Sequence, residues 1–151
     1  MNTLYTKMIE YYPGDPKRIQ HFTKVHSYAR LIGQLEHLSD DTQNILEIAA
    51  LVHDIGIKIS ELKYGNCNGK NQEKEGKAEA EKLLTELGYP QEVIERVSYL
   101  VGHHHSYDQI EGMDYQILVE ADFLVNYFED HLETESIKKS VKKIFKTETG
   151  I

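Results

Sequence analysis

Apolar residues recur at intervals of three and four along most of this chain, which is the spacing of helices with one buried face. One stretch carries Ile45, Ile48, Ala49, Val52 and Ile55. Segments of this kind cover residues 16–37, 40–57, 72–87, 91–105, 115–128 and 135–146, after a short amphipathic stretch over residues 4–12. No segment alternates apolar and polar residues over the length of a strand. The pattern predicts an all-α bundle of about six helices.

Glycine, proline and asparagine separate these segments. Pro13-Gly14 ends the first one, and Asp15 followed by Pro16 has the residue types of a helix N-cap and first turn. Gly88-Tyr89-Pro90 ends a later segment. Residues 58–71 include Gly65, Asn66, Asn68, Gly69 and Asn71, and therefore predict a long loop, which in a compact domain is often functional.

The length and composition are those of one globular domain. At 151 residues, with 40% hydrophobic and 28% charged residues, the chain can bury a core and is not expected to be disordered. We predict one domain over residues 1–151, with its core over about 21–129 and a closing helix over about 135–146. The apolar runs are too short for a membrane span, and the first twelve residues lack the apolar stretch of a signal peptide. Cys67 is the single cysteine, so no internal disulfide is possible, and we predict a cytoplasmic protein.

The formal net charge of -8 argues against binding of a nucleic-acid polymer, which depends on lysine and arginine. Residues 58–77 differ, because five lysines outnumber three glutamates there. Such a segment could attract a small anionic molecule, although solvated surface lysines explain it more simply. The ten tyrosines are spread along the chain and leave the oligomeric state open.

Four ionisable residues fall within the apolar patterns, where they need partners. His26 continues the face formed by Ile19, Phe22 and Ala29, and the other three are His53, Asp54 and Asp122. Each one alone is explained by a hydrogen bond within the core or by a helix cap. Together they supply two imidazoles and two carboxylates, a donor set suited to manganese, iron, nickel, cobalt or zinc. We therefore predict a divalent metal ion held by His26, His53, Asp54 and Asp122.

The order of these residues resembles the HD superfamily of metal-dependent phosphohydrolases. His26 is followed by His53-Asp54 within Ala-Leu-Val-His-Asp-Ile-Gly, and then by Asp122 within Val-Glu-Ala-Asp-Phe-Leu-Val. The resemblance spans about residues 21–129. It implies an HD-type helical domain whose His, His-Asp and Asp hold a catalytic divalent metal. It also implies hydrolysis of a phosphomonoester or phosphodiester, with nucleotides among the candidate substrates.

Members of this superfamily that bind two metals carry additional histidines, and the chain matches that pattern only in part. His104 and His105 fit the later pair of histidines. The earlier histidine would precede Gly76, Ala80 and Leu84 by four, eight and twelve residues, and Gln72 stands there. Glutamine is a poor replacement for an imidazole ligand. We expect one firmly held metal, and whether Gln72, Glu73 or Glu75 completes a second site stays open.

The expected reaction is hydrolysis of a small phosphate-containing anion by a metal-activated water. His104 or His105 would orient the substrate or protonate the leaving oxygen, and Lys58 would pair with a phosphate oxygen. A surface lysine that stabilises a helix C-terminus explains Lys58 equally well. Two alternatives stay open: a non-catalytic metal-bound or ligand-sensing domain, and an iron-dependent oxygenase, against which the missing histidine at position 72 counts.

Overall fold

The computed structural model describes residues 2–65, 69–131 and 133–150, which form helices and connecting turns without a strand. The eight helices of this described part are α1 (Asn2–Tyr11), α2 (Pro16–Leu35), α3 (Asp40–Val52), α4 (Gly56–Tyr64), α5 (Gly69–Glu86), α6 (Gln91–Val101), α7 (Met113–Glu129) and α8 (Thr134–Ile144). The all-α prediction is confirmed. The helix count is higher than expected because the stretch over residues 4–12 forms a helix of its own, α1, and because α4 occupies much of the predicted loop over residues 58–71. Cys67 lies outside the described residues.

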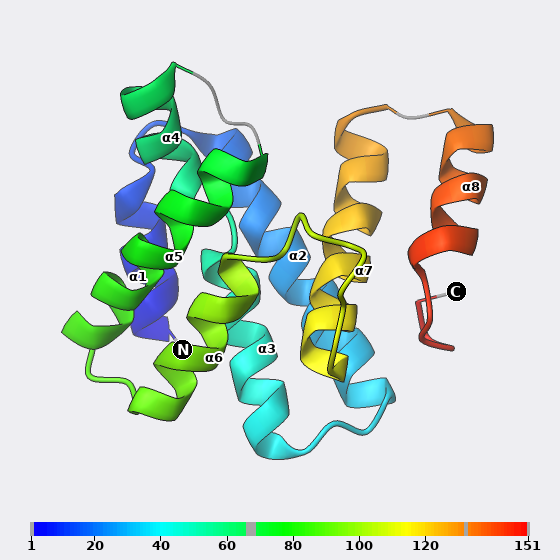
Figure 1. Cartoon of the computed structure of the whole chain (residues 1–151), viewed down its shortest axis with the longest axis horizontal. Coiled ribbons are helices and arrows are strands. Elements are labelled where there is room, and N and C mark those ends of the chain that lie inside the picture. The colour runs from blue at the N-terminus through cyan, green and yellow to red at the C-terminus, as the bar shows by residue number, and fades with distance from the viewer. Residues whose placement is uncertain (1, 66–68, 132, 151) are drawn as a thin grey trace.

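Helix α3 lies at the centre of the bundle and packs against α1, α2, α6 and α7. Its consecutive residues Ala49, Ala50, Leu51 and Val52 are all fully buried. A helical turn that is apolar on every side is stable only where neighbouring helices surround it. In Figure 1, α3 accordingly runs between α6 on one side and α2 on the other.

Helix α2 is buried over more than one narrow face. It packs against both α3 and α7, and its buried residues include the adjacent pairs His21 and Phe22, and Val25 and His26. Neighbouring residues on a helix point about 100° apart. Both histidines therefore lie inside the protein, but they face different neighbours.

The polypeptide bends sharply between α3 and α4, immediately at the His-Asp pair. His53 caps the C-terminus of α3, and α4 begins at Gly56. A Cβ atom at Gly56 would lie 2.3 Å from the carbonyl oxygen of Gln72 and 2.5 Å from the backbone nitrogen of Gly76. Only glycine allows this close approach, which places the first half of α5 beside the His-Asp turn.

The long loop predicted over residues 58–71 is wrong. Helix α4 continues to Tyr64, and α5 begins at Gly69. Gly65 ends α4 in the left-handed conformation (φ 70°), and its N–H donates to the carbonyl of Glu61. Glycine is the usual residue at such a helix end. The glycine and asparagine cluster thus marks a helix end and a short connection rather than a long loop.

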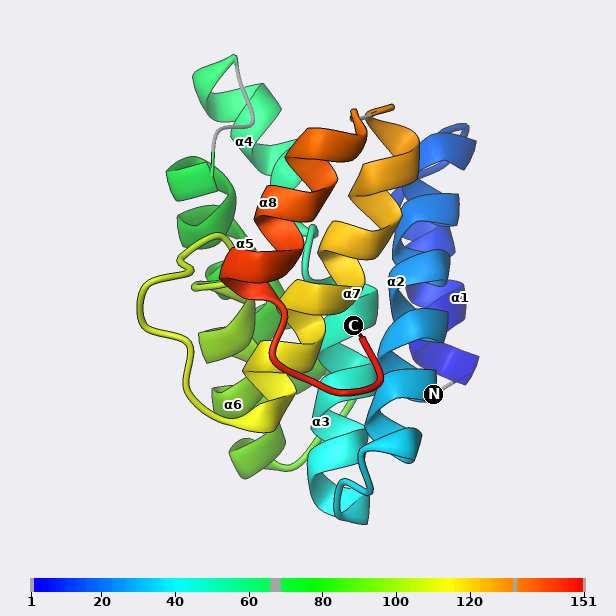
Figure 2. The same cartoon turned by 90° about the vertical axis from the view of Figure 1, so that its right-hand side faces the viewer.

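The C-terminal segment is attached to α7 by a buried carboxylate. Glu120 is fully buried and accepts hydrogen bonds from the Thr147 hydroxyl (2.6 Å) and from the backbone N–H groups of Lys146 and Thr147. Helix α8 packs along α7, and the segment after it crosses the bundle towards α2, as Figure 2 shows. None of the helices in the described ranges has the length and apolar content needed to cross a lipid bilayer.

Candidate metal centre

Four side chains from three helices and one turn converge in the interior: His21 of α2, His53 at the end of α3, Asp54 in the turn that follows, and Asp122 of α7. His21 Nε2 lies 3.0 Å from Asp54 Oδ2 and 3.1 Å from Asp122 Oδ1. His53 Nε2 lies 3.2 and 3.4 Å from the same two oxygens. The two Nε2 atoms are 3.3 Å apart. We call these four residues the metal cluster.

The separations within the metal cluster fit ligands of one small cation. Nitrogen and oxygen ligands lie roughly 2.1 Å from a divalent transition metal, so two ligands are roughly 3.0 Å apart at a right angle and roughly 3.4 Å apart at the tetrahedral angle. The five distances given above fall in this interval. The donor set therefore fits one divalent ion.

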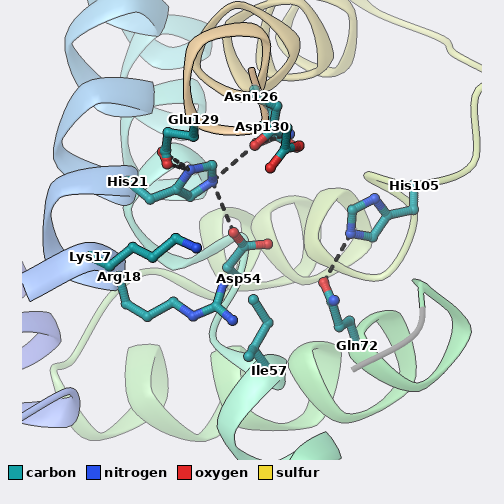
Figure 3. Close-up of a pocket in the computed structure, with 11 residues that line it drawn as sticks. Lys17, Arg18, His21, Asp54, Ile57, Gln72, His105, Asn126, Glu129 and Asp130 are labelled. Atoms are coloured by element: carbon teal, nitrogen blue, oxygen red, sulfur yellow. Dashed lines mark hydrogen bonds and ion pairs between the residues drawn. The ribbon is translucent and has the colours of Figure 1, made fainter. Parts of the chain in front are cut away.

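The two histidines are oriented to present Nε2 to the centre of the metal cluster. His53 Nδ1 is 2.7 Å from the Ala50 carbonyl oxygen and donates to it. His21 Nδ1 is 2.8 Å from Oε1 of Glu129, which lies two turns after Asp122 on the same face of α7. A carboxylate or carbonyl that accepts from the distal nitrogen fixes the tautomer that a metal-binding histidine requires. Figure 3 shows Glu129 on the far side of the His21 ring from Asp54.

Charge on the cluster is balanced by protons. Burial alone would lower the pKa of His21, but hydrogen bonds to Asp122 and Asp54 outweigh it and raise that pKa to about 10. The pKa of His53 is also raised, because the two aspartates outweigh its complete burial. Burial would raise the pKa values of Asp54 and Asp122, yet the surrounding histidines lower both. Two imidazolium and two carboxylate charges therefore cancel near neutral pH.

His26, which we predicted to be a ligand, does not lie in the metal cluster. Its Nδ1 is 2.8 Å from the Tyr5 hydroxyl, and its Nε2 is 3.2 Å from Glu47 Oε1. His26 therefore faces α1 and α3, whereas His21, five residues earlier, faces α7. The apolar pattern selected His26 because it continues the face of Phe22. Helix α2 is buried on two faces, however, and the second face carries the histidine of the cluster.

Glu129, the hydrogen-bond partner of His21, was not predicted from the sequence. Its spacing of seven residues from Asp122 places it on the same face of α7 and could have indicated it.

His104 and His105 lie beside the metal cluster on the turn after α6. His104 is buried, and its Nε2 lies 3.3 Å from Asp54 Oδ1 without a well-aligned hydrogen bond among the described residues. The turn is stabilised by Tyr115, whose hydroxyl donates to the carbonyl oxygens of His103 and Ser106. Asp54 thus presents one oxygen to His21 and His53 and the other to His104.

The second group of potential ligands is Asp54, His104 and His105. Gln72, which stands where the family resemblance would place a histidine, lies at this group, and its Oε1 is 2.9 Å from His105 Nε2. Glu73 accepts from the backbone N–H of His105 and from the Ser106 hydroxyl, while Glu75 lies 3.3 Å from Lys63 Nζ. Gln72 is therefore the side chain next to His105, and the two glutamates support the surrounding structure.

The metal cluster forms one end of a pocket of about 170 Å³ that opens to solvent. Its lining residues are Lys17, Arg18, His21, Asp54, Ile57, Gln72, His105, Asp122, Asn126, Glu129 and Asp130. In Figure 3, Lys17 and Arg18 extend from α2 towards Asp54. Neither cation was singled out from the sequence, because exposed basic residues in a first helical turn are common. Lys58, which we expected beside the phosphate, does not line this pocket; its Nζ donates to the carbonyl oxygen of Tyr11.

Comparisons with known proteins identify the family of this chain. The family model of the HD domain matches residues 18–146. The chain belongs to the HD domain family. The crystal structure of a predicted HD superfamily hydrolase from an uncultured Thermotogales bacterium shares its fold, with a TM-score of 0.71 at 24% sequence identity. That alignment covers 99% of this chain and 80% of the other. No curated protein is similar enough to match.

The two buried histidines of α2 provide a matched pair of variants for metal binding. We expect His21→Ala to weaken the binding of Mn²⁺ or Zn²⁺ by roughly 100-fold or more, since loss of even an outer hydrogen-bond partner costs 10–100-fold. His26→Ala should retain wild-type affinity. Isothermal titration calorimetry, with circular dichroism to verify folding, measures both. Equal losses in the two variants would contradict the assignment of His21.

Metal binding should also release protons. Because the pKa of His21 is about 10 and that of His53 is raised, both imidazoles carry a proton at pH 7 before binding. A ligating imidazole must be neutral, so binding of one ion displaces about two protons. Calorimetric titrations at pH 7 in buffers of different ionisation enthalpy measure this number. Release of no protons would contradict the prediction that both histidines are protonated before the ion binds.

Proposed function

We propose that this HD domain protein is a metal-dependent phosphohydrolase that acts on small phosphate esters. The observation that carries the proposal is the position of the metal cluster at one end of a solvent-open pocket whose wall includes Lys17 and Arg18. A metal bound only to connect helices would not need an opening to solvent or adjacent cations. A divalent ion bound there would make a water molecule more acidic and neutralise charge on a phosphoryl group.

Lys17 and Arg18 would bind the oxygens of the substrate phosphate. Both belong to the first turn of α2, where the partial positive charge of the helix N-terminus also favours an anion. Arg18 is only loosely paired, since its Nη2 lies 3.8 Å from Glu61 Oε1. An arginine can form two parallel hydrogen bonds with a phosphate, which would fix the orientation of the ester.

His105 would orient the substrate rather than donate a proton to the leaving oxygen. Burial, together with the neighbouring His104, lowers the pKa of His105 to about 4, so the ring is neutral near pH 7. Its Nε2 is already oriented by Gln72 Oε1 at 2.9 Å. His104 is buried behind Asp54 and would support that ligand instead of contacting the ester.

The proposed function is tested with purified protein, freed of metal and reloaded separately with each candidate ion. We expect hydrolysis of p-nitrophenyl phosphate that chelation removes and metal restores. Asp54→Asn should lower turnover by roughly 100-fold or more, because it weakens a shared ligand of the cluster. His26→Ala serves as the matched control. Spectrophotometric assay and metal analysis of every preparation provide the two measurements.

Three results would contradict the proposed phosphohydrolase function. Metal-loaded, folded protein that turns over neither this ester nor a panel of nucleotides and sugar phosphates would favour the ligand-sensing alternative. Oxygen consumption by the iron-loaded protein would favour the oxygenase. Turnover that survives Asp54→Asn would place the activity outside the metal cluster.

A further inference from the structure

Asp54 is the residue of the metal cluster whose backbone is least supported by a helix. His21 and Asp122 lie within α2 and α7, whereas Asp54 lies in the turn between α3 and α4. The same aspartate belongs to both groups of potential ligands, since its Oδ2 faces His21 and His53 and its Oδ1 faces His104. The direction of its carboxylate therefore depends on what holds the backbone of this turn.

The hydroxyl of Tyr12 holds the backbone of Asp54. It donates to the carbonyl oxygen of Asp54 at 2.9 Å, and this oxygen also accepts from the backbone N–H of Ile57 at 3.0 Å. The neighbouring Tyr11 hydroxyl donates to the carbonyl oxygen of Ile55 at 3.4 Å, which is a longer and weaker bond. The end of α1 is thus attached directly to the turn that supplies a metal ligand.

The position of this hydroxyl is fixed by the packing of the Tyr12 ring. The residue is only 6% exposed, and the centre of its ring lies 6.4 Å from that of Phe22. Its carbonyl oxygen accepts from the backbone N–H of Asp15, the N-cap of α2, at 3.2 Å. Because closely packed interiors resist displacement, a tyrosine held in this way opposes movement of Asp54.

We infer that Tyr12 is a positioning residue of the metal centre: its hydroxyl holds the carbonyl of Asp54, so that the carboxylate of Asp54 is directed at the other cluster residues. The inference rests on the proposed function, in which the cluster holds the catalytic metal. A site whose ligands are already in place binds its metal more tightly, because less rearrangement opposes binding. Tyr12 precedes residues 18–146, so the HD domain match does not include it.

A purely structural hydrogen bond would behave differently. It would stabilise the folded protein equally with and without metal, so its loss would leave the metal affinity of the folded protein unchanged. Tyr5 offers a comparison, because its hydroxyl also joins α1 to a buried side chain, at 2.8 Å from His26 Nδ1, outside the metal cluster. Replacing either tyrosine by phenylalanine removes one oxygen atom and keeps the ring.

The experiment compares Tyr12→Phe with Tyr5→Phe, in protein freed of metal and then titrated with Co²⁺. The melting temperature of each metal-free variant should fall by roughly 2–4 °C, because each loses one hydrogen bond. We expect Tyr12→Phe alone to weaken Co²⁺ binding by roughly tenfold, the lower end of the range for outer hydrogen-bond partners. The visible absorption spectrum of Co²⁺ bound to Tyr12→Phe should also differ from that of the wild type, since these bands depend on ligand geometry.

A second measurement uses the wild-type protein, in case Tyr12→Phe does not fold. If the Tyr12 hydroxyl favours metal binding, bound metal must in turn stabilise the contact of Tyr12 with the turn. Hydrogen exchange, followed by mass spectrometry, should therefore slow more over residues 9–15 than over residues 2–8 when Co²⁺ is added.

Three results would overturn the role of Tyr12 while the proposed phosphohydrolase function stands. They are wild-type Co²⁺ affinity and spectrum in Tyr12→Phe, equal losses of affinity in Tyr12→Phe and Tyr5→Phe, and equal slowing of exchange in the two segments. If the wild-type protein binds no metal at the cluster, the proposed function fails and the inference fails with it.

Discussion

Two buried carboxylates need positive charge, and the centre of this protein is built to supply it. Asp54 and Asp122 meet where α2, α3 and α7 converge, and each is surrounded by histidines. Burying an unpaired carboxylate is strongly unfavourable. Two protonated imidazoles balance the two acids, and one divalent ion bound by neutral imidazoles would balance them equally well. The cluster can therefore exchange two protons for one metal ion without leaving a net charge in the core.

The helices around the cluster are arranged by ordinary packing rules, and the chemistry depends on where they stop. The last turn of α3 is apolar on all sides and ends in the centre of the bundle, so His53, which follows it directly, lies in the interior. Gly56 permits α4 to begin at once against the backbone of α5, which brings Gln72 towards His105. The first turn of α2 then contributes the cations Lys17 and Arg18. The proposed substrate would lie across these helix ends.

The sequence was sufficient to predict most of the fold and three of the four cluster residues. Helical periodicity identified α2, α3, α5, α6, α7 and α8 because each has a distinct apolar face, and the adjacent His53 and Asp54 stood out within an apolar run. The pattern failed at His21, since a single-face rule cannot describe a helix buried on two sides. The pattern also failed over residues 58–71, because the glycine and asparagine residues there are typical of a long loop. Gly65 instead ends a helix, α4. The position of Lys17 and Arg18 at the pocket is set by the orientation of α2 in the bundle. The spacing of residues along the chain does not predict that orientation.

Metal binding by the four cluster residues is tested most directly by anomalous X-ray diffraction from crystals of the metal-loaded protein, recorded on both sides of the absorption edge of the metal. An ion bound there is expected to give an anomalous peak roughly 2.1 Å from His21 Nε2, His53 Nε2, Asp54 Oδ2 and Asp122 Oδ1, with the Nδ1 of His21 still donating to Glu129. A peak beside His26, or crystals in which the four side chains remain paired with one another and hold no ion, would contradict this expectation.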